Sequence, residues 1–146
     1  MNREQWLDEF VEWLEAFPWC WFCSLTFRPG LSAAQARWRL RKWTDALRDE
    51  LGTPNFEWIA VPEHGHTGLD FHYHALIAGL REYHATQRLE WMRRWHKIGG
   101  DARIDTFKPD VGGVRYLLKN VGPQDTDALE LHLNARTQLQ TTWGAK

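Results

Sequence analysis

The sequence predicts an α+β domain of the ferredoxin-like, split β-α-β type, in which helices cover one face of an antiparallel sheet. Three observations lead to this fold class. After a first helical segment, strand-like and helix-like patterns follow in the order β-α-β-β-α-β-α. Only turn-forming residues separate the two strands in the middle of this order, which predicts a hairpin. The chain has 146 residues, 43% of them hydrophobic, which is enough for one compact core.

The first half of the chain contains two helical segments with a strand between them. Apolar residues recur at helical spacing over residues 3–16. The aromatic-rich run WCWFCSLTF at 19–27 is typical of a strand. Ser32 is placed as the N-cap of a long helix over 33–51, which Gly52 ends.

The second half begins with strands expected at 56–63 and 69–79, followed by a helix over 84–97. The segment 101–107 is a predicted strand, and a last helix is expected from about Asp110 through VRYLLKN, ending at Gly122-Pro123. The pattern therefore supplies the strands of one sheet and the helices that cover it.

We interpret residues 1–146 as one domain, because no repeat, low-complexity segment or linker divides the chain. It consists of an N-terminal helix (1–18), a core (19–121) and a tail (122–146). One more helix is expected in the tail, around ALELHLNA.

The net charge of −1 gives no general attraction for nucleic acids, for which a basic balance is usual. The charges are segregated, however. Residues 1–16 are acidic, whereas basic residues cluster at 37–42 and 88–97, so a positive groove beside an acidic helix is compatible with the sequence. Ten tryptophans are many for this length; we expect most in the core and some near the surface, where indoles stack on bases.

Neither membrane insertion nor cysteine chemistry is predicted. No run approaches the roughly 20 apolar residues that span a bilayer, and the acidic, amphipathic N-terminus does not resemble a secretory signal, so we expect a cytoplasmic protein. Cys20 and Cys23 form a lone CxxC, but a structural zinc site normally needs four ligands. We interpret both as small buried hydrophobic residues.

The clearest local feature is the pair His72 and His74 in FHYHALI. Positions two apart on a strand share a face, so both imidazoles can reach one metal ion, while Tyr73 faces the core. If the hairpin turn centres near Thr67 and Gly68, Glu63 lies opposite His72 and its carboxylate joins this face. Two imidazoles and one carboxylate, with positions left open, suit a divalent ion that also takes a substrate oxygen.

The first strand places Ser24 and Thr26 on one face, where small hydroxyl side chains can contact a nucleic-acid backbone. Simple cross-strand packing is the alternative for these two residues. Arg28 and Arg115 are also predicted to contact DNA.

The third feature is GGVRYLLKN, in which Tyr116 and Lys119 are three apart and project from one side of the predicted helix. A tyrosine beside a metal ion can attack a phosphodiester whose charge the metal and the lysine offset. Tyrosine and lysine at this spacing are also ordinary helix residues. Their meaning therefore depends on the histidine pair.

In this order, the three features resemble the motifs of the replication-initiator (Rep) proteins of the HUH endonuclease superfamily. WFCSLTF looks like the first motif, HYHALI resembles the HUH motif, and RYLLKN resembles the third motif, Tyr-x-x-Lys, in its single-tyrosine form. The resemblance covers about residues 19–121.

This resemblance implies an active site on the sheet face opposite the helices, with Mg²⁺ or Mn²⁺ held by His72 and His74 and with Glu63 in the place of the third ligand. It implies that Tyr116 attacks single-stranded DNA at a replication origin or hairpin and becomes joined to the 5′-phosphate. Lys119 carries over as the lysine that positions the scissile phosphate or steadies the transition state.

Two departures and three alternatives stay open. Asn120 stands where the family often has an aromatic residue, and the chain shows no helicase domain, so we expect a host helicase and polymerase as partners. The same chemistry would serve a single-tyrosine transposase or mobilisation nuclease. The fold would also suit a non-catalytic module that binds single-stranded nucleic acid, or a hydrolase of small phosphoesters. The sequence does not decide the oligomeric state.

Overall fold

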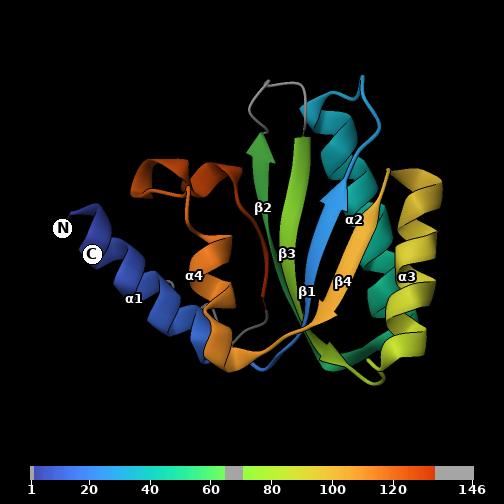
Figure 1. Cartoon of the computed structure of the whole chain (residues 1–146), viewed down its shortest axis with the longest axis horizontal. Coiled ribbons are helices and arrows are strands. Elements are labelled where there is room, and N and C mark those ends of the chain that lie inside the picture. The colour runs from blue at the N-terminus through green and yellow to red at the C-terminus, as the bar shows by residue number, and fades with distance from the viewer. Residues whose placement is uncertain (1, 65–70, 134–146) are drawn as a thin grey trace.

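The computed structural model describes residues 2–64 and 71–133. A five-stranded sheet of antiparallel neighbours, in the order β4-β1-β3-β2-β5, runs through the centre (Figure 1) and confirms the predicted α+β class. No helix in the described ranges has the length and apolar character needed to cross a membrane. The helices and strands are α1 (Arg3–Glu15), β1 (Trp19–Thr26), α2 (Ala33–Leu51), β2 (Gly52–His64), β3 (Phe71–Leu80), α3 (Ala85–Ile98), β4 (Ala102–Thr106), α4 (Gly113–Leu117) and β5 (Glu130–His132).

Helices α1 and α2 both begin at capping boxes. The side chain of Asn2 accepts a hydrogen bond from the backbone N–H of Gln5 at 2.9 Å, and Ser32 does the same for Gln35 at 3.1 Å. Each glutamine side chain in turn accepts from the backbone N–H of its cap residue. Two donors of each first turn are thereby satisfied, which fixes where the helix starts and confirms Ser32 as the predicted N-cap.

Strands β2 and β3 form the predicted hairpin at the centre of the sheet. Their register pairs Glu63 with His72, as expected. Strand β2 begins at Gly52, earlier than the predicted start at 56, because its pairing with β3 continues across an irregularity. The predicted turn at 67–68 lies outside the described residues.

Helices α2 and α3 cover one face of the sheet (Figure 1). The core beneath them contains three fully buried tryptophans: Trp21, Trp43 and Trp95. Trp95 donates from its indole nitrogen to the carbonyl of Thr26 at 2.9 Å, and Trp43 donates to the carbonyl of Trp91 at 3.0 Å. These buried N–H groups are therefore paired, and the tryptophans serve packing as predicted.

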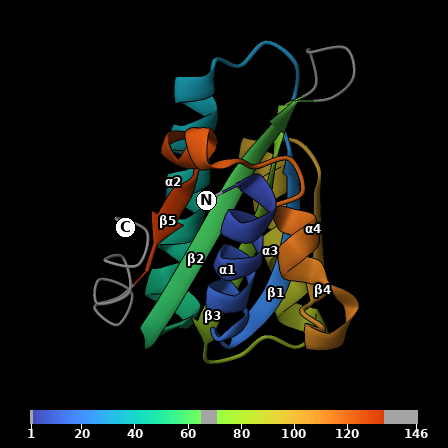
Figure 2. The same ribbon diagram turned by 90° about the vertical axis from the view of Figure 1, so that its left-hand side faces the viewer.

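Helices α1 and α4 lie on the opposite face (Figures 1 and 2). A second core joins them to the sheet, and its buried members include Leu7, Phe10, Leu14, Ile59, Leu76, Val114, Leu117 and Leu118. The sequence analysis placed helices on one face only. The second layer exists because the apolar sides of α1 and α4 must also be buried. It leaves part of this face, referred to below as the site face, open beside α4.

The last predicted helix is much shorter than expected. The expectation was a continuous helix from about residue 110 to 120, whereas α4 has only five residues. Gly112 has a φ of 75°, in the left-handed region, and separates α4 from a 3₁₀ turn at Pro109–Val111. Lys119 and Asn120 consequently lie in a turn after α4.

The tail also differs from its predicted helix. Residues Pro123–Ala128 form a 3₁₀ turn, and Glu130–His132 form β5, which pairs with β2 at the sheet edge. Pairing with an exposed edge satisfies backbone groups that a short helix would leave open at its ends. Residues 134–146 lie outside the described part of the chain.

Cys20 and Cys23 are free cysteines. Cys23 is fully buried in the core beneath α2 and α3, and Cys20 packs against the same core. Burial raises the pKa of the Cys23 thiol, which disfavours the reactive thiolate. Both observations agree with a packing role.

Candidate functional site

Three potential metal ligands converge on the site face. The Nε2 atoms of His72 and His74 lie 3.3 and 2.9 Å from Oε2 of Glu63. One donor atom from each residue lies within 4.8 Å of the other two. The structure thus brings together the carboxylate and the two imidazoles that the sequence predicted, and we refer to them as the trio.

Strand pairing accounts for this arrangement. His72 and His74 point to the same face because they are two apart on β3, and the antiparallel register brings Glu63 on β2 beside them. Between them, Tyr73 points into the core beneath α2 and α3. A slip of one residue would turn Glu63 away from the histidines, so the buried residues of the hairpin fix the site.

The second carboxylate oxygen of Glu63 is held by the turn that follows α4. Oε1 accepts from Nζ of Lys119 at 3.0 Å and from Nδ2 of Asn120 at 3.0 Å. The sequence analysis noted Asn120 only as a departure from the family pattern and did not place it in the site. An amide directly after the motif lysine was the one available signal.

The protonation states of the trio suit metal binding. Burial alone would raise the pKa of Glu63, but hydrogen bonds from Lys119 and Asn120, with the positive charges of His74 and Lys119, outweigh it and hold this pKa below its usual value. Burial lowers the pKa of His74, helped by the charges of His72 and Lys119 and opposed by Glu63. An ionised carboxylate and a neutral imidazole are the forms that bind metals.

The donor atoms fit a divalent ion, since two imidazoles and one carboxylate leave positions open for substrate oxygens. Nδ1 of His74 is buried and has no hydrogen-bond partner among the described residues. Metal-bound histidines usually donate from this second nitrogen. Here the rings of Phe22 and Tyr116 flank His74, at centroid distances of 5.8 and 5.6 Å. Aromatic packing therefore orients this ligand.

Tyr116 lies beside the trio and is 52% exposed. Nζ of Lys119 lies 3.8 Å from the centre of its ring, so these two residues share a side even though Lys119 follows the helix. The chain has three tyrosines, all in the described ranges. Tyr73 is 3% exposed in the core, and Tyr83 follows the far end of β3. Tyr116 is thus the tyrosine with access to both the trio and solvent.

Packing rather than helix length holds Tyr116 in place. Helix α4 has five residues and no side-chain cap, and so short a helix is not stable alone. Its residues Val114 and Leu117, and the following Leu118, are buried against α1 and the sheet. The nucleophile candidate therefore depends on the second core.

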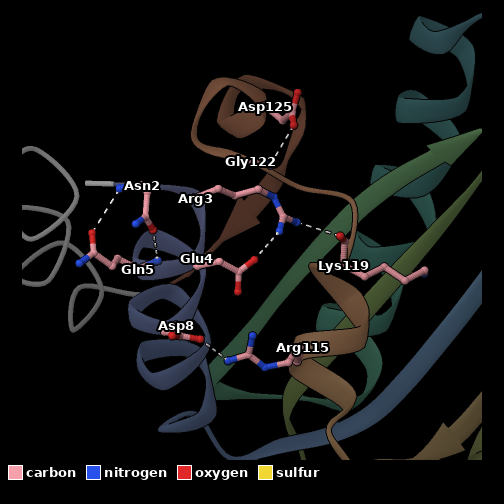
Figure 3. Close-up of polar contacts among 9 residues, drawn as sticks. All are labelled: Asn2, Arg3, Glu4, Gln5, Asp8, Arg115, Lys119, Gly122 and Asp125. Atoms are coloured by element: carbon pink, nitrogen blue, oxygen red, sulfur yellow. Dashed lines mark hydrogen bonds and ion pairs between the residues drawn. The ribbon is translucent and has the colours of Figure 1, made fainter.

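Polar contacts also join α1 to the segment that carries Tyr116 (Figure 3). Arg115 donates to Oδ1 of Asp8 at 2.6 Å, and Arg3 donates to the carbonyl of Lys119 at 2.8 Å. The side chain of Lys119 extends away from α1, toward the sheet (Figure 3). The N-terminal helix thus holds both ends of this segment.

Of the residues predicted to contact DNA, Ser24 and Thr26 lie on the site face. Ser24 pairs with His74 and Thr26 with His72 across β1 and β3. The hydroxyl of Thr26 donates to the carbonyl of Asp101 at 3.0 Å, so it is already engaged at the start of β4. Contact of either residue with DNA remains a prediction.

The two predicted arginine contacts are engaged within the protein. Arg28 donates to the carbonyl of Gly99 at 3.0 Å, at the end of α3, and Arg115 is paired with Asp8. Both uses depend on contacts between segments far apart in the chain, which the sequence pattern did not reveal. A role in DNA binding would require each guanidinium to make further contacts.

Comparison with known proteins agrees with the Rep resemblance. Residues 20–125 match the family model described as Replication-associated protein ORF2. The chain belongs to this family. The matched part of this replication-associated protein includes the trio, Tyr116 and Lys119. No curated protein and no solved structure matches the chain significantly.

Proposed function

We infer that the chain is a metal-dependent HUH endonuclease of the single-tyrosine type, which nicks and rejoins single-stranded DNA to initiate rolling-circle replication. The observation that carries this proposal is the position of Tyr116, whose ring centre lies 5.6 Å from that of His74. Lys119 contacts both this ring and Glu63. A nucleophile, a cation and a set of metal ligands in one place are what phosphodiester transfer needs. Membership of a replication-associated family supports the biological role.

The proposed reaction transfers a phosphodiester from a DNA oxygen to tyrosine. Oη of Tyr116 forms a bond to phosphorus while the bond between phosphorus and the 3′-oxygen breaks. The phenol loses its proton and the 3′-oxygen gains one, which gives a 5′-phosphotyrosine and a free 3′-hydroxyl. Because the linkage remains a phosphodiester, a 3′-hydroxyl can attack it and rejoin the strands.

The residues of the site divide this work. His72, His74 and Glu63 would hold Mg²⁺ or Mn²⁺, which supplies Lewis-acid polarisation of the scissile phosphate. Lys119 places a positive charge where negative charge develops on the tyrosine oxygen and the phosphate. The exposure of Tyr116 lets a DNA strand reach it.

The proposed substrate is single-stranded DNA at a replication origin or in a hairpin. A duplex would hide its bases and hold its strand away from the sheet, so the strand must be melted first. The released 3′-hydroxyl is a primer. A host helicase and polymerase are therefore the proposed partners.

The test is covalent capture of DNA on the protein. The chain is incubated with Mn²⁺ and a pool of single-stranded oligonucleotides, labelled at either the 3′ or the 5′ end, and run on a denaturing gel. A 5′-phosphotyrosine predicts that the 3′ label appears on the protein and the 5′ label on shortened free strands. Tyr116→Phe and EDTA should abolish both products, whereas the matched variant Tyr83→Phe should retain them.

Two results would contradict the proposal. An adduct that persists in Tyr116→Phe would assign the nucleophile to another residue. Cleavage absent from every pool, with folded protein that binds the DNA equally well in EDTA, would favour a non-catalytic binding module.

A further inference from the structure

A groove beside Tyr116 has no role in the chemistry proposed above. Its volume is about 440 Å³, and it opens over β4, a strand at the edge of the sheet. Phe22 belongs both to the groove and to the site, because its ring lies 6.1 Å from that of Tyr116 and 5.8 Å from that of His74. The groove therefore begins where the site ends.

Strand pairing gives a direct path from the trio to this groove. Ser24 on β1 pairs with His74 on one side and with Arg103 on the other. The three side chains consequently form one row across the site face. Ile104, the neighbour of Arg103, is buried in the opposite core, which agrees with this orientation. Two strand spacings separate Arg103 from His74, roughly 10 Å.

The groove combines positive charge with aromatic rings. Arg88, Arg103 and Lys108 line it together with Phe22 and Phe107. The side chain of Arg103 is 79% exposed. Basic groups that follow a backbone, beside aromatic rings that stack on bases, are the usual means of binding single-stranded nucleic acid.

One acidic residue, Asp105, also lines the groove. Its Oδ2 accepts from Nε of Arg103 at 3.0 Å. A guanidinium has five N–H donors, so this bond leaves others for an anion. Asp105 reduces the positive charge of the groove without removing it.

The opposite side of Tyr116 is unsuited to a polyanion. Helix α1 lies there, and its exposed residues include Glu4, Asp8, Glu12 and Glu15. Asp8 already binds Arg115, so that cation is neutralised (Figure 3). Charges repel over a Debye length of about 8–10 Å at ordinary salt. A DNA strand at Tyr116 is therefore repelled from α1 and attracted toward β4.

We propose that the groove over β4 binds the nucleotide next to the scissile phosphate, with Arg103 and Lys108 on the DNA backbone and the aromatic rings of Phe22 and Phe107 against the base. The substrate class rests on the proposed function. The new content is the path of the strand, which runs from the trio past Ser24 to β4 and away from α1.

The test compares two double charge reversals in the full chain. Arg103→Glu with Lys108→Glu alters the groove, whereas Lys42→Glu with Arg48→Glu alters the exposed side of α2 on the opposite face of the sheet. Binding of a fluorescent random-sequence single-stranded oligonucleotide is measured by anisotropy in EDTA, where no strand is cut. The groove variant should bind at least about tenfold more weakly, and its salt dependence should fall by about 1.4 in log–log slope, because two phosphate contacts are lost. The α2 variant should change affinity less than about threefold.

Asp105→Asn provides a variant with the opposite expected sign. It removes the acidic charge of the groove and should tighten binding about twofold or more. The rise in melting temperature caused by Mn²⁺ should be the same in all of these variants as in the wild type, because none alters the trio. That readout also establishes that each variant is folded.

Three results would overturn the groove proposal: a groove variant that binds like the wild type, an equal loss in the α2 variant, or a wild-type chain that does not bind the pool. These outcomes are separate from the proposed nicking function. Adduct formation at Tyr116 can fail while the groove still contributes to binding. Conversely, a groove variant that binds normally can still form the adduct.

Discussion

Asn120 donates a hydrogen bond of 3.0 Å to Oε1 of Glu63, the carboxylate oxygen that does not face the two histidines. The other oxygen, Oε2, lies 2.9 Å from His74 and 3.3 Å from His72. The amide therefore fixes the rotation of the carboxylate and leaves the ligand-facing oxygen free. Contacts of this kind around a ligand decide how well it is oriented for a metal.

Removal of this amide should weaken metal binding. Asn120→Ala is expected to lower Mn²⁺ affinity about tenfold, the lower end of the usual effect of such contacts. Titration calorimetry with Mn²⁺ measures this directly. Asn55→Ala, at the other end of β2, is the matched control and should bind like the wild type. Unchanged affinity in Asn120→Ala would mean that Lys119 alone orients Glu63.

The carboxylate itself should be indispensable for the effect of metal on stability. In the wild type, Mn²⁺ at about 100 times its Kd should add about 2.7 kcal/mol to the free energy of unfolding. Glu63→Gln should abolish most of this gain, because an amide oxygen is a weaker ligand than a carboxylate. Thermal unfolding with and without Mn²⁺ tests the prediction. Glu50→Gln alters a carboxylate that binds Arg94 instead, and it should keep the gain.

Stability should fall with acid in part because of His132. Its ring stacks on Trp58 with centroids 4.2 Å apart, and burial together with the charge of Arg41 lowers its pKa in the folded state. The unfolded chain, with an ordinary pKa near 6.5, then binds more protons, so stability is full above that value and decreases as pH falls toward the folded pKa.

Urea unfolding in EDTA between about pH 7.5 and pH 5.5 measures this dependence. His132→Asn should flatten it relative to the wild type, although His74 contributes a slope of the same sign. Identical slopes in both proteins would show that His132 is protonated as easily in the folded state as in the unfolded chain.

The two cores should have different effects on chemistry. Leu117→Ala in the second core and Leu40→Ala beneath α2 both empty a fully buried site, and each should cost about 2–5 kcal/mol. Only Leu117 lies next to Tyr116 on α4. At a temperature where both variants remain folded, Leu117→Ala should therefore slow adduct formation more than Leu40→Ala. Equal rates would show that α4 keeps its place without this side chain.

The part of the site that the sequence predicted is the part encoded by local pattern. His72, His74 and Glu63 all lie in one hairpin, where a period of two and a short turn determine which side chains share a face. The strand at 19–27 and the cap at Ser32 were predicted for similar local reasons.

The remainder depends on contacts between distant segments. Asn120 reaches Glu63 only because α4 ends early, and Arg115 is engaged only because α1 packs beside it. Periodicity also misjudged the tail, since a short run such as the one at 128–133 has apolar residues that suit either a helix or an edge strand. The available edge of β2 decided the outcome.

The layer formed by α1 and α4 has a consequence for how this chain can vary over generations. Helix α1 contributes no group to the trio, yet its Leu7, Phe10 and Leu14 support the short helix that carries Tyr116. Natural selection for DNA cleavage would therefore act on the interior side of α1 as strictly as on the histidines. Its outward acidic positions would be free to drift so long as they keep their sign.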